Sequence, residues 1–445
     1  PPPASRGLNT VNRLHPRQLM AVASVLAFAA LALAVADPQV RLIPLPNNAS
    51  PRDLLYNPIS NKLYAANTPQ PGAPSGESVT IINGATDSVI RVIEMGAGPR
   101  DFCLNTQSNK VYVANYFADT VTVIDGATDQ ILAVTPVGDG PRALCYNPQN
   151  NRIYCANEFS ANVTVIDGAT NAVVASVTVG STPRVICYNS VSNKIYCPNA
   201  GSQTVSVISG ATNTLLANVP VGNVPRGILF NPQNNRVYCS NYSSDTVSVI
   251  DGVTNAVVAT IAVGDGPTAM GHNPVGNKVY VPNVGAPGPN TPPACSVSVI
   301  DAASSTVLKT LTTGDEPTAF CFSPGDQRMY WVNEWSHSLA ATDAASDTQV
   351  LLLPLGTGQV QPVDMAYNSV NDQVYTCNRL TYTIGVVDTA APCPADLDGT
   401  KSVDGGDLSL MLLQFGDSGP ADLDRDGAVS AGDVALLLLD FGPCA

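Results

Sequence analysis

The feature that most constrains the fold is a unit that recurs along most of the chain. One copy, residues 141–180, reads PRALCYNPQNNRIYCANEFSANVTVIDGATNAVVASVTVG. It contains four short segments rich in Val, Ile, Tyr or Thr, at residues 143–147, 152–157, 162–167 and 172–179. Such segments, bounded by Pro, Asn, Asp or Gly, predict strands joined by tight turns rather than a helix. Recurrence at a fixed period predicts a repeat protein.

Eight copies of the unit follow one another, and the last copy is incomplete. It has three predicted strands and stops near Thr389, whereas residues 40–45 (VRLIPL) resemble a fourth strand and precede the first copy. A β-propeller closes its ring in this way and leaves no free sheet edge. We therefore expect an all-β, eight-bladed propeller closed by an N-terminal strand, or a seven-bladed one if a divergent copy forms no blade. The copies begin at Pro51, Pro99, Pro141, Pro183, Pro225, Pro267, Pro317 and Pro362.

A Tyr-x-x-Asn tetrapeptide ends the second predicted strand of every copy, and several third strands end in Val-Ile-Asp-Gly. These motifs resemble the YVTN family of β-propeller repeats over about residues 40–390. The resemblance implies the fold and a relation to secreted, surface-layer and lactonase-type propellers. It implies little about a reaction, because one fold hosts many functions. We expect each Tyr to pack between blades and each Asn to cap a turn. The tyrosines are Tyr64, Tyr112, Tyr154, Tyr196, Tyr238, Tyr280, Tyr330 and Tyr375.

The N-terminal 36 residues have the pattern of a secretory signal peptide. Arg13, His15 and Arg17 precede an uncharged apolar run from Leu19 to Ala36, which ends Ala-Val-Ala. A basic start, an apolar middle and a small-residue end predict export and cleavage. An uncleaved membrane anchor is the alternative, because the run approaches the length of a spanning helix. Both alternatives predict that residues 37–391, the propeller, are secreted or held at the cell surface.

Residues 392–445 form a second predicted domain, rich in aspartate. The second of its two similar halves places Asp at loop positions 1, 3, 5 and 12 and Gly427 at position 6, a pattern typical of Ca²⁺ loops. The first half has Lys401 where Gly is expected, which predicts weaker Ca²⁺ binding. The predicted ligands are Asp422, Asp424, Asp426 and Asp433 in one loop and Asp396, Asp398, Thr400, Asp404 and Asp407 in the other.

This module resembles a dockerin, in which two EF-hand-like loops are each followed by a helix. The resemblance implies a cohesin-like protein, or another cell-surface component, as a partner of residues 393–445. Loop positions 10 and 11, where dockerins often carry hydroxyl residues, are Gly405, Gly406, Ala431 and Gly432 here. Cys393 and Cys444 bracket the module. We expect a disulfide between them, because so small a domain needs a crosslink or a bound metal for stability, and an exported protein meets oxidising conditions in which disulfides form.

Composition excludes several functions. The formal net charge is −14, which disfavours nucleic-acid binding because phosphate contacts need clustered Lys and Arg. After the predicted signal peptide only His272 and His337 remain, so a His-metal cluster or a Ser-His-Asp triad is not expected. We assign no catalytic residue.

Cys145 and Cys155 lie across one predicted hairpin. The length of the turn decides whether their side chains lie opposite each other or are separate buried apolar residues.

Arginine follows the opening proline in five consecutive copies: Arg52, Arg100, Arg142, Arg184 and Arg226. This position lies where the chain enters the inner strand of a blade, so the five side chains predict an arc at the mouth of the ring. Guanidinium groups suit bidentate contacts to carboxylates and other anions. The alternative is an internal ion pair or hydrogen bond in each blade, for example to Asp53, Asp101 or Glu158.

The sequence therefore predicts a secreted or cell-surface binding or scaffold protein without catalysis. Its propeller is expected to be monomeric and to offer a rigid face that binds a small anionic ligand or a polysaccharide. Its C-terminal module is expected to bind Ca²⁺ and to attach to a partner, and a membrane is contacted only through an uncleaved N-terminus. The alternative is a lactonase-like hydrolase that acts on an acidic sugar lactone.

Overall fold

The structure, a computed structural model, describes residues 40–68, 77–285, 295–389, 402–403, 405–415, 421, 423, 429–439 and 442–443. The chain divides into two compact units. Residues 38–389 form one, and residues 1–37 with 390–445 form the other. The predicted signal peptide, residues 69–76 and 286–294, and the pair Cys393 and Cys444 lie outside the described residues.

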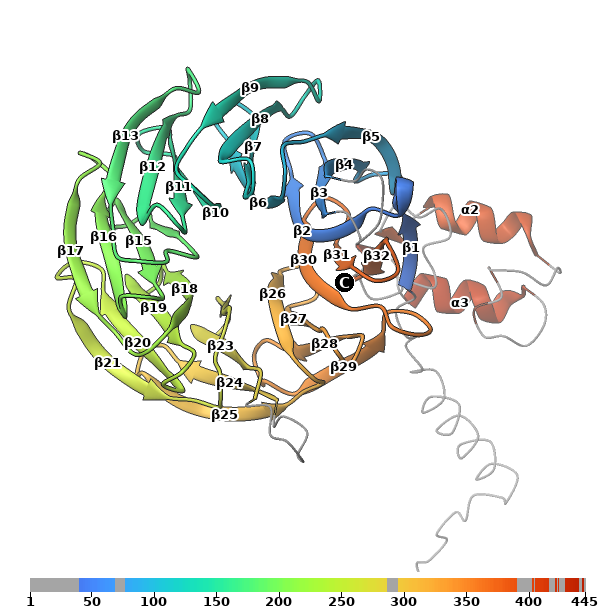
Figure 1. Ribbon diagram of the computed structural model, residues 1–445. Helices are drawn as coiled ribbons and strands as arrows, with labels where there is room; N and C mark the ends of the chain where they lie inside the picture. Colours follow the sequence, from blue (N-terminus) through green and yellow to red (C-terminus); the bar gives the residue numbers. More distant parts are fainter. Residues whose placement is uncertain are drawn as a thin grey trace, which may run out of the picture. The chain divides into compact units, whose positions relative to one another are not determined.

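The larger unit is a ring of eight four-stranded antiparallel sheets, the blades (Figure 1). The prediction of eight blades is confirmed, and the seven-bladed alternative is wrong. Strands are given from the inner to the outer one. Blade 1 comprises β2 (Ser50–Asn57), β3 (Lys62–Thr68), β4 (Ser78–Asn83) and β5 (Ser88–Glu94), and blade 2 comprises β6 (Pro99–Asn105), β7 (Lys110–Asn115), β8 (Thr120–Asp125) and β9 (Ile131–Pro136). Blade 3 comprises β10 (Pro141–Asn147), β11 (Arg152–Asn157), β12 (Asn162–Asp167) and β13 (Val173–Thr178), and blade 4 comprises β14 (Cys187–Asn189), β15 (Lys194–Asn199), β16 (Thr204–Ser209) and β17 (Leu215–Pro220).

Blades 5 to 8 repeat this order. They comprise β18 (Pro225–Asn231), β19 (Arg236–Asn241), β20 (Thr246–Asp251) and β21 (Val257–Ala262); β22 (Gly271–Asn273), β23 (Lys278–Asn283), β24 (Ser296–Asp301) and β25 (Thr306–Thr312); β26 (Pro317–Ser323), β27 (Arg328–Asn333), β28 (Ser338–Asp343) and β29 (Gln349–Pro354); β30 (Pro362–Asn368), β31 (Gln373–Asn378), β32 (Thr383–Asp388) and β1 (Val40–Pro44). A short 3₁₀ turn, η1 (Pro46–Asn48), links β1 to β2.

The N-terminal strand closes the ring, as the sequence predicts. β1 pairs antiparallel with β32, in a register that runs from Val40 opposite Val387 to Pro44 opposite Thr383. Ile43 is buried in the core that blades 8 and 1 share. Closure therefore gives blade 8 its outer strand from the other end of the propeller sequence, and every blade has two neighbours.

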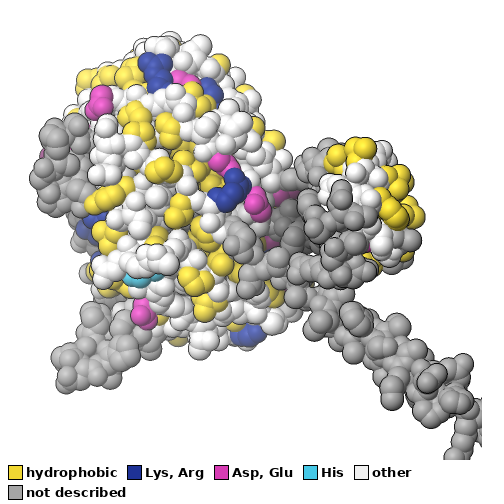
Figure 2. Space-filling view, turned by 90° about the vertical axis from the view of Figure 1, so that its right-hand side faces the viewer, with side chains coloured by type: hydrophobic (Ala, Val, Ile, Leu, Met, Phe, Trp, Pro, Cys, Tyr) yellow, Lys and Arg dark blue, Asp and Glu magenta, His cyan; other side chains and the backbone are white. Residues whose placement is uncertain are grey.

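The hydrophobic core lies between blades rather than within them. The second and third strands are almost fully buried, whereas the outer strand is largely exposed. Tyr154 and Ala156 of blade 3, for example, pack against Ile195 and Cys197 of blade 4. Figure 2 shows one side of the surface, where apolar side chains are scattered and few charged side chains appear. Each blade thus needs both neighbours to bury its two faces.

The motif tyrosines join neighbouring blades by hydrogen bonds as well as by packing. All eight are buried. The Tyr154 hydroxyl donates to Asn213 Oδ1 of the next blade at 2.6 Å, and Tyr112 donates to Asn171 Oδ1 at 2.9 Å. Tyr64, Tyr196, Tyr238, Tyr280 and Tyr375 make the equivalent contact with the next blade. Tyr330 departs from this pattern and donates to Asp326 within its own blade.

The motif asparagines act within a blade. Their amides donate to hydroxyl groups of the third strand, as from Asn157 to Thr164 at 2.9 Å and from Asn199 to Ser206 at 2.9 Å. This contact spans the turn between the second and third strands, in agreement with the expected turn-capping role. A second set of asparagines, at the ends of inner strands, was not anticipated. Asn105 and Asn147 donate across to Asn151 and Asn193 of the following blade.

The cysteines of the propeller are free thiols among the described residues. Cys145 lies opposite Tyr154, and Cys155 lies opposite Leu144. The four-residue turn therefore places the two sulfurs on opposite faces of the sheet, and the open question of hairpin pairing is settled against a disulfide there. Cys145, Cys155 and Cys197 are buried and behave as small apolar side chains.

The smaller unit contains two helices, α2 (Gly405–Leu413) and α3 (Ala431–Leu439), and a two-stranded pairing of β33 (Ser402–Val403) with β34 (Gly442–Pro443). Met411, Ala421, Val429 and Leu437 form its buried core. None of the helices in the described part of the chain has the length and apolar character needed to cross a bilayer.

We predict that Tyr154→Phe lowers the free energy of unfolding of the propeller by about 1–2 kcal/mol, because it removes a buried hydrogen bond between blades. Tyr188→Phe is the matched control. The Tyr188 hydroxyl is buried and has no hydrogen-bond partner among the described residues, so its removal should leave the stability unchanged or slightly raised. Urea unfolding followed by circular dichroism measures both. Equal losses in the two variants would contradict the role of the inter-blade hydrogen bond.

Candidate functional site

Two positions of every blade meet at the face of the ring where the inner strands begin. We call this the arginine face. One position follows the proline at the start of the inner strand, and the other follows the motif asparagine. The backbone holds them together, as when Glu158 N–H donates to the Gly140 carbonyl at 2.8 Å. In blade order the first set is Arg52, Arg100, Arg142, Arg184, Arg226, Thr268, Thr318 and Val363, and the second is Thr68, Tyr116, Glu158, Ala200, Tyr242, Val284, Glu334 and Arg379.

These positions make the arginine face locally basic. They contribute six arginines and two glutamates to a chain whose formal net charge is −14. Guanidinium groups of adjacent blades lie close enough to repel one another, from Arg379 through Arg52 and Arg100 to Arg142. A run of like charges held on rigid strands attracts anions.

Glu158 neutralises two members of the arc. Its Oε2 accepts from Arg142 Nη1 at 2.7 Å, and its Oε1 accepts from Arg184 Nε at 3.0 Å. The Tyr116 hydroxyl donates to the same carboxylate at 2.8 Å. Burial alone would raise the pKa of Glu158, but Tyr116 and the two guanidinium groups outweigh it and hold the pKa below its usual value. For Arg142 and Arg184 the internal ion-pair alternative therefore holds.

Arg52 and Arg100 have no such partner. Arg52 Nε donates to Thr68 Oγ1 at 2.7 Å, and the Arg100 guanidinium lies 4.7 Å from the centre of the Tyr116 ring. Among the described residues neither arginine forms an ion pair. Burial first, and then the neighbouring guanidinium, lowers the pKa of each. Both side chains therefore keep donors for which the described residues offer no acceptor.

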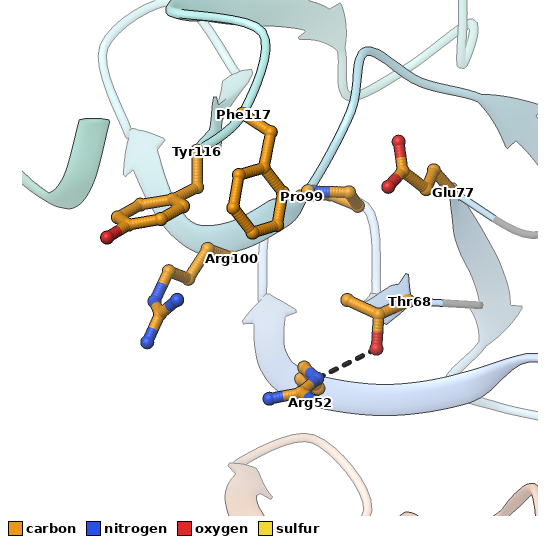
Figure 3. Close-up of a pocket in the computed structure, with 8 residues that line it drawn as sticks. Arg52, Thr68, Glu77, Pro99, Arg100, Tyr116 and Phe117 are labelled. Atoms are coloured by element: carbon orange, nitrogen blue, oxygen red, sulfur yellow. Dashed lines mark hydrogen bonds between the residues drawn. The ribbon is translucent and has the colours of Figure 1, made fainter. Parts of the chain in front are cut away.

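The two arginines line a pocket between blades 1 and 2 of about 260 Å³. Figure 3 shows their side chains entering from adjacent inner strands, below Tyr116 and Phe117 in that view, with Arg52 bonded to Thr68. Phe117 is 71% exposed, although it is a large apolar side chain. The pocket thus combines two cations, one carboxylate (Glu77) and an exposed aromatic ring. Its lining is Arg52, Thr68, Glu77, Gly98, Pro99, Arg100, Tyr116 and Phe117.

The remaining predicted arginine stands apart from the pocket. The Arg226 guanidinium lies 3.6 Å from the centre of the Tyr242 ring in its own blade, which is a cation–π contact. The structure thus divides the five predicted arginines into a pocket pair, a glutamate-bound pair and one stacked on tyrosine. Asp53 and Asp101, which were alternative ion-pair partners, form no salt bridge with an arginine among the described residues.

Sequence reasoning missed Arg379, Tyr116 and Phe117. Each lies one or two residues after a motif asparagine, so reading that position through all copies would have found them. Arg379 interacts with Glu334, whose Oε1 accepts from Gln361 Nε2 at 2.8 Å. Burial, and next the nearby Glu316 carboxylate, raises the pKa of Glu334.

Of the predicted Ca²⁺ ligands, only Asp407 and Asp433 fall within the described residues. They stand in the first turns of α2 and α3 and are fully buried. Asp433 Oδ2 also accepts the Ser430 backbone N–H at 2.7 Å. An acidic residue in this turn is where the last ligand of an EF-hand-type loop belongs, so both residues fit that role. Among the described residues no three His, Cys, Asp or Glu side chains converge as a metal site.

Comparison with known proteins agrees with the fold. The model of the lactonase family, described as a 7-bladed β-propeller, matches residues 127–256, which include all of blades 3 and 4. Among solved structures, the hydrazine synthase of Kuenenia stuttgartiensis aligns with a TM-score of 0.53 and 18% identity, over 66% of this chain and 96% of that one. No curated protein matches the chain. Together with the ring itself, these likenesses identify a β-propeller protein and leave its ligand open.

We predict that Glu158→Gln destabilises the propeller at neutral pH by about 1–3 kcal/mol, because a buried carboxylate that serves two guanidinium groups is lost. Because the folded-state pKa of Glu158 is depressed, this carboxylate stabilises the wild type above about pH 4.5. The stabilisation is lost as the pH falls through the folded-state pKa. The variant should lack this part of the acid dependence. Unfolding curves across this range test it, with the exposed Glu94→Gln as the control; identical acid profiles for wild type and Glu158→Gln would contradict it.

Proposed function

We propose that the protein binds an anionic ligand at the arginine face and does no chemistry on it. The observation that carries this proposal is the pair Arg52 and Arg100. They stand in adjacent blades, repel like-charged neighbours and form no ion pair with a described carboxylate, yet they line one pocket. Holding two such cations together is unfavourable unless an anion joins them.

A carboxylated sugar is the ligand class that best suits this pocket. The forked guanidinium groups can take a carboxylate in bidentate fashion. Phe117 offers an exposed apolar face, against which the C–H face of a sugar ring can lie. A cavity of about 260 Å³ is at the small end of ligand sites, which suits one or two sugar units. A polysaccharide with repeated acidic units could continue along the arc toward Arg226.

The C-terminal unit completes the proposal. We infer that residues 1–36 direct export and that residues 393–445 bind Ca²⁺ and attach the propeller to a protein partner. The buried carboxylates Asp407 and Asp433, each in the first turn of a helix, support this role. Ca²⁺ would supply the charge that holds the aspartate-rich loops together in so small a domain.

A lactonase-like hydrolase is the second candidate. The family-model match over residues 127–256 favours it, as does Asp101, which lies next to Arg100 and whose pKa burial raises to about 7. A carboxylate with a pKa near the working pH can act as a general base. Hydrolysis of an aldaric acid lactone that is lost in Asp101→Asn would support the enzyme over the binding protein.

We predict that Arg52→Ala and Arg100→Ala each weaken the binding of trigalacturonate about tenfold or more, because each removes a charge-assisted contact. Arg91→Ala is the control. It removes the same charge from an exposed position on β5 and should leave the affinity unchanged. Titration calorimetry on the full chain measures this, with a neutral trisaccharide as the second probe. Equal binding of both sugars would contradict an anion site.

We predict two Ca²⁺ sites of unequal affinity in the full chain. Replacing Asp422, Asp424 and Asp426 by Ala should abolish the tighter site, whereas replacing Asp396 and Asp398 should remove only the weaker one, because the first loop has Lys401 at the turn. Calorimetric titration with Ca²⁺ and helix content by circular dichroism measure the effect. A full chain that takes up no Ca²⁺ would overturn the role assigned to the C-terminal unit.

A further inference from the structure

Three carboxyl groups stand one residue beyond the arginine-face position in three consecutive blades. They are Asp364 in blade 8, Asp53 in blade 1 and Asp101 in blade 2. Asp53 and Asp101 directly follow the pocket residues Arg52 and Arg100 on the same strands. The equivalent residues of the other blades are Ala143, Val185, Gly227, Ala269 and Ala319. The acidic cluster is therefore confined to the part of the ring that carries the pocket.

Two carboxyl groups of the cluster accept a hydrogen bond from the next blade. Asp364 Oδ2 accepts the Leu54 backbone N–H at 2.7 Å, and Asp101 Oδ2 accepts that of Leu144 at 2.5 Å. The Asp53 carboxyl group lies close enough to those of Asp364 and Asp101 to interact with both. Carboxylates this near one another repel, so their proximity favours the uptake of a proton.

The surroundings offer the cluster little positive charge. Arg100 is the cation that interacts with it, through Asp101. Burial first, and then the mutual repulsion of the carboxylates, raises the pKa of Asp53; burial raises that of Asp101 to about 7 and that of Asp364 to about 6. Five cysteine thiols interact with the charge of the cluster, and burial raises the pKa of each, so they stay neutral. They are Cys103, Cys145, Cys155, Cys321 and Cys377.

We propose that anion binding in the Arg52–Arg100 pocket is coupled to proton uptake by the cluster of Asp53, Asp101 and Asp364. This inference rests on the proposed function and adds its regulation. When Asp101 is ionised, its negative charge competes with the ligand for the Arg100 guanidinium. When the cluster is protonated, the guanidinium charge is left to the ligand. Because linkage is reciprocal, the bound anion in turn favours the protonated cluster.

Calorimetry on the full chain tests the coupling. Trigalacturonate, which stays ionised throughout, is titrated between about pH 5.5 and about pH 8 in buffers of different ionisation heat, and the slope against that heat gives the protons taken up. We expect proton uptake near neutral pH and an affinity that falls about tenfold as the pH rises, the effect of one shifted carboxyl group. Absence of binding at every pH would overturn the proposed function itself. Binding with constant affinity and no proton uptake would overturn only the coupling.

Two variants assign the effect to the cluster. The triple variant Asp53→Asn, Asp101→Asn, Asp364→Asn keeps an oxygen for each backbone donor and cannot ionise. It should bind at all pH values with the affinity of the wild type at low pH. If it fails to fold, Asp101→Asn alone should reduce the proton uptake. Glu334→Gln is the control for the other acid with a raised pKa at this face; pH dependence that survives in the triple variant and vanishes in Glu334→Gln would overturn the proposal.

Discussion

The contact between neighbouring blades is the constraint on which the rest of this structure depends. Each blade buries its second and third strands against the blades beside it, and a tyrosine such as Tyr154 donates a hydrogen bond into the turn of the next blade. Since no blade has a core of its own, an open ring would expose two apolar faces. Pairing of β1 with β32 removes them. The closed ring then holds the inner strands rigidly, which is why side chains at their ends keep fixed places.

A rigid ring explains how two positions of each blade determine the chemistry of the arginine face. The repeat fixes where the residue after proline and the residue after the motif asparagine stand, and their identities vary from blade to blade. Glu158 in blade 3 neutralises two arginines, whereas Thr68 in blade 1 leaves the charge of Arg52 in place. The chemistry of this face thus depends on residues that differ between blades at equivalent positions of the repeat. The acids Asp53, Asp101 and Asp364 lie one residue further along the same strands.

The fold was largely readable from the sequence, and the site only in part. Eight copies, an incomplete last copy and a stray fourth strand at the N-terminus were enough to predict eight blades and their closure. The arginine arc was found because the repeat aligns the copies. The division of these arginines into a pocket pair, a glutamate-bound pair and one stacked on tyrosine was not found, because an alignment of the repeats does not show which neighbour each side chain contacts. Arg142 and Arg184 share Glu158, which lies 16 residues from one and 26 from the other, and Arg52 meets Arg379 only because the ring closes.

By itself, the sequence determined the number of blades, the strand that closes the ring, the place of the arginines in the repeat and the aspartate pattern of the C-terminal loops. These are local or periodic properties, so spacing and residue type suffice. Only the tertiary structure decided which arginines form no ion pair among the described residues, that Cys145 and Cys155 lie on opposite faces of their sheet, and that Asp53 lies near Asp364. Those facts depend on contacts across blades, and residues from opposite ends of the propeller become neighbours only when the ring is closed.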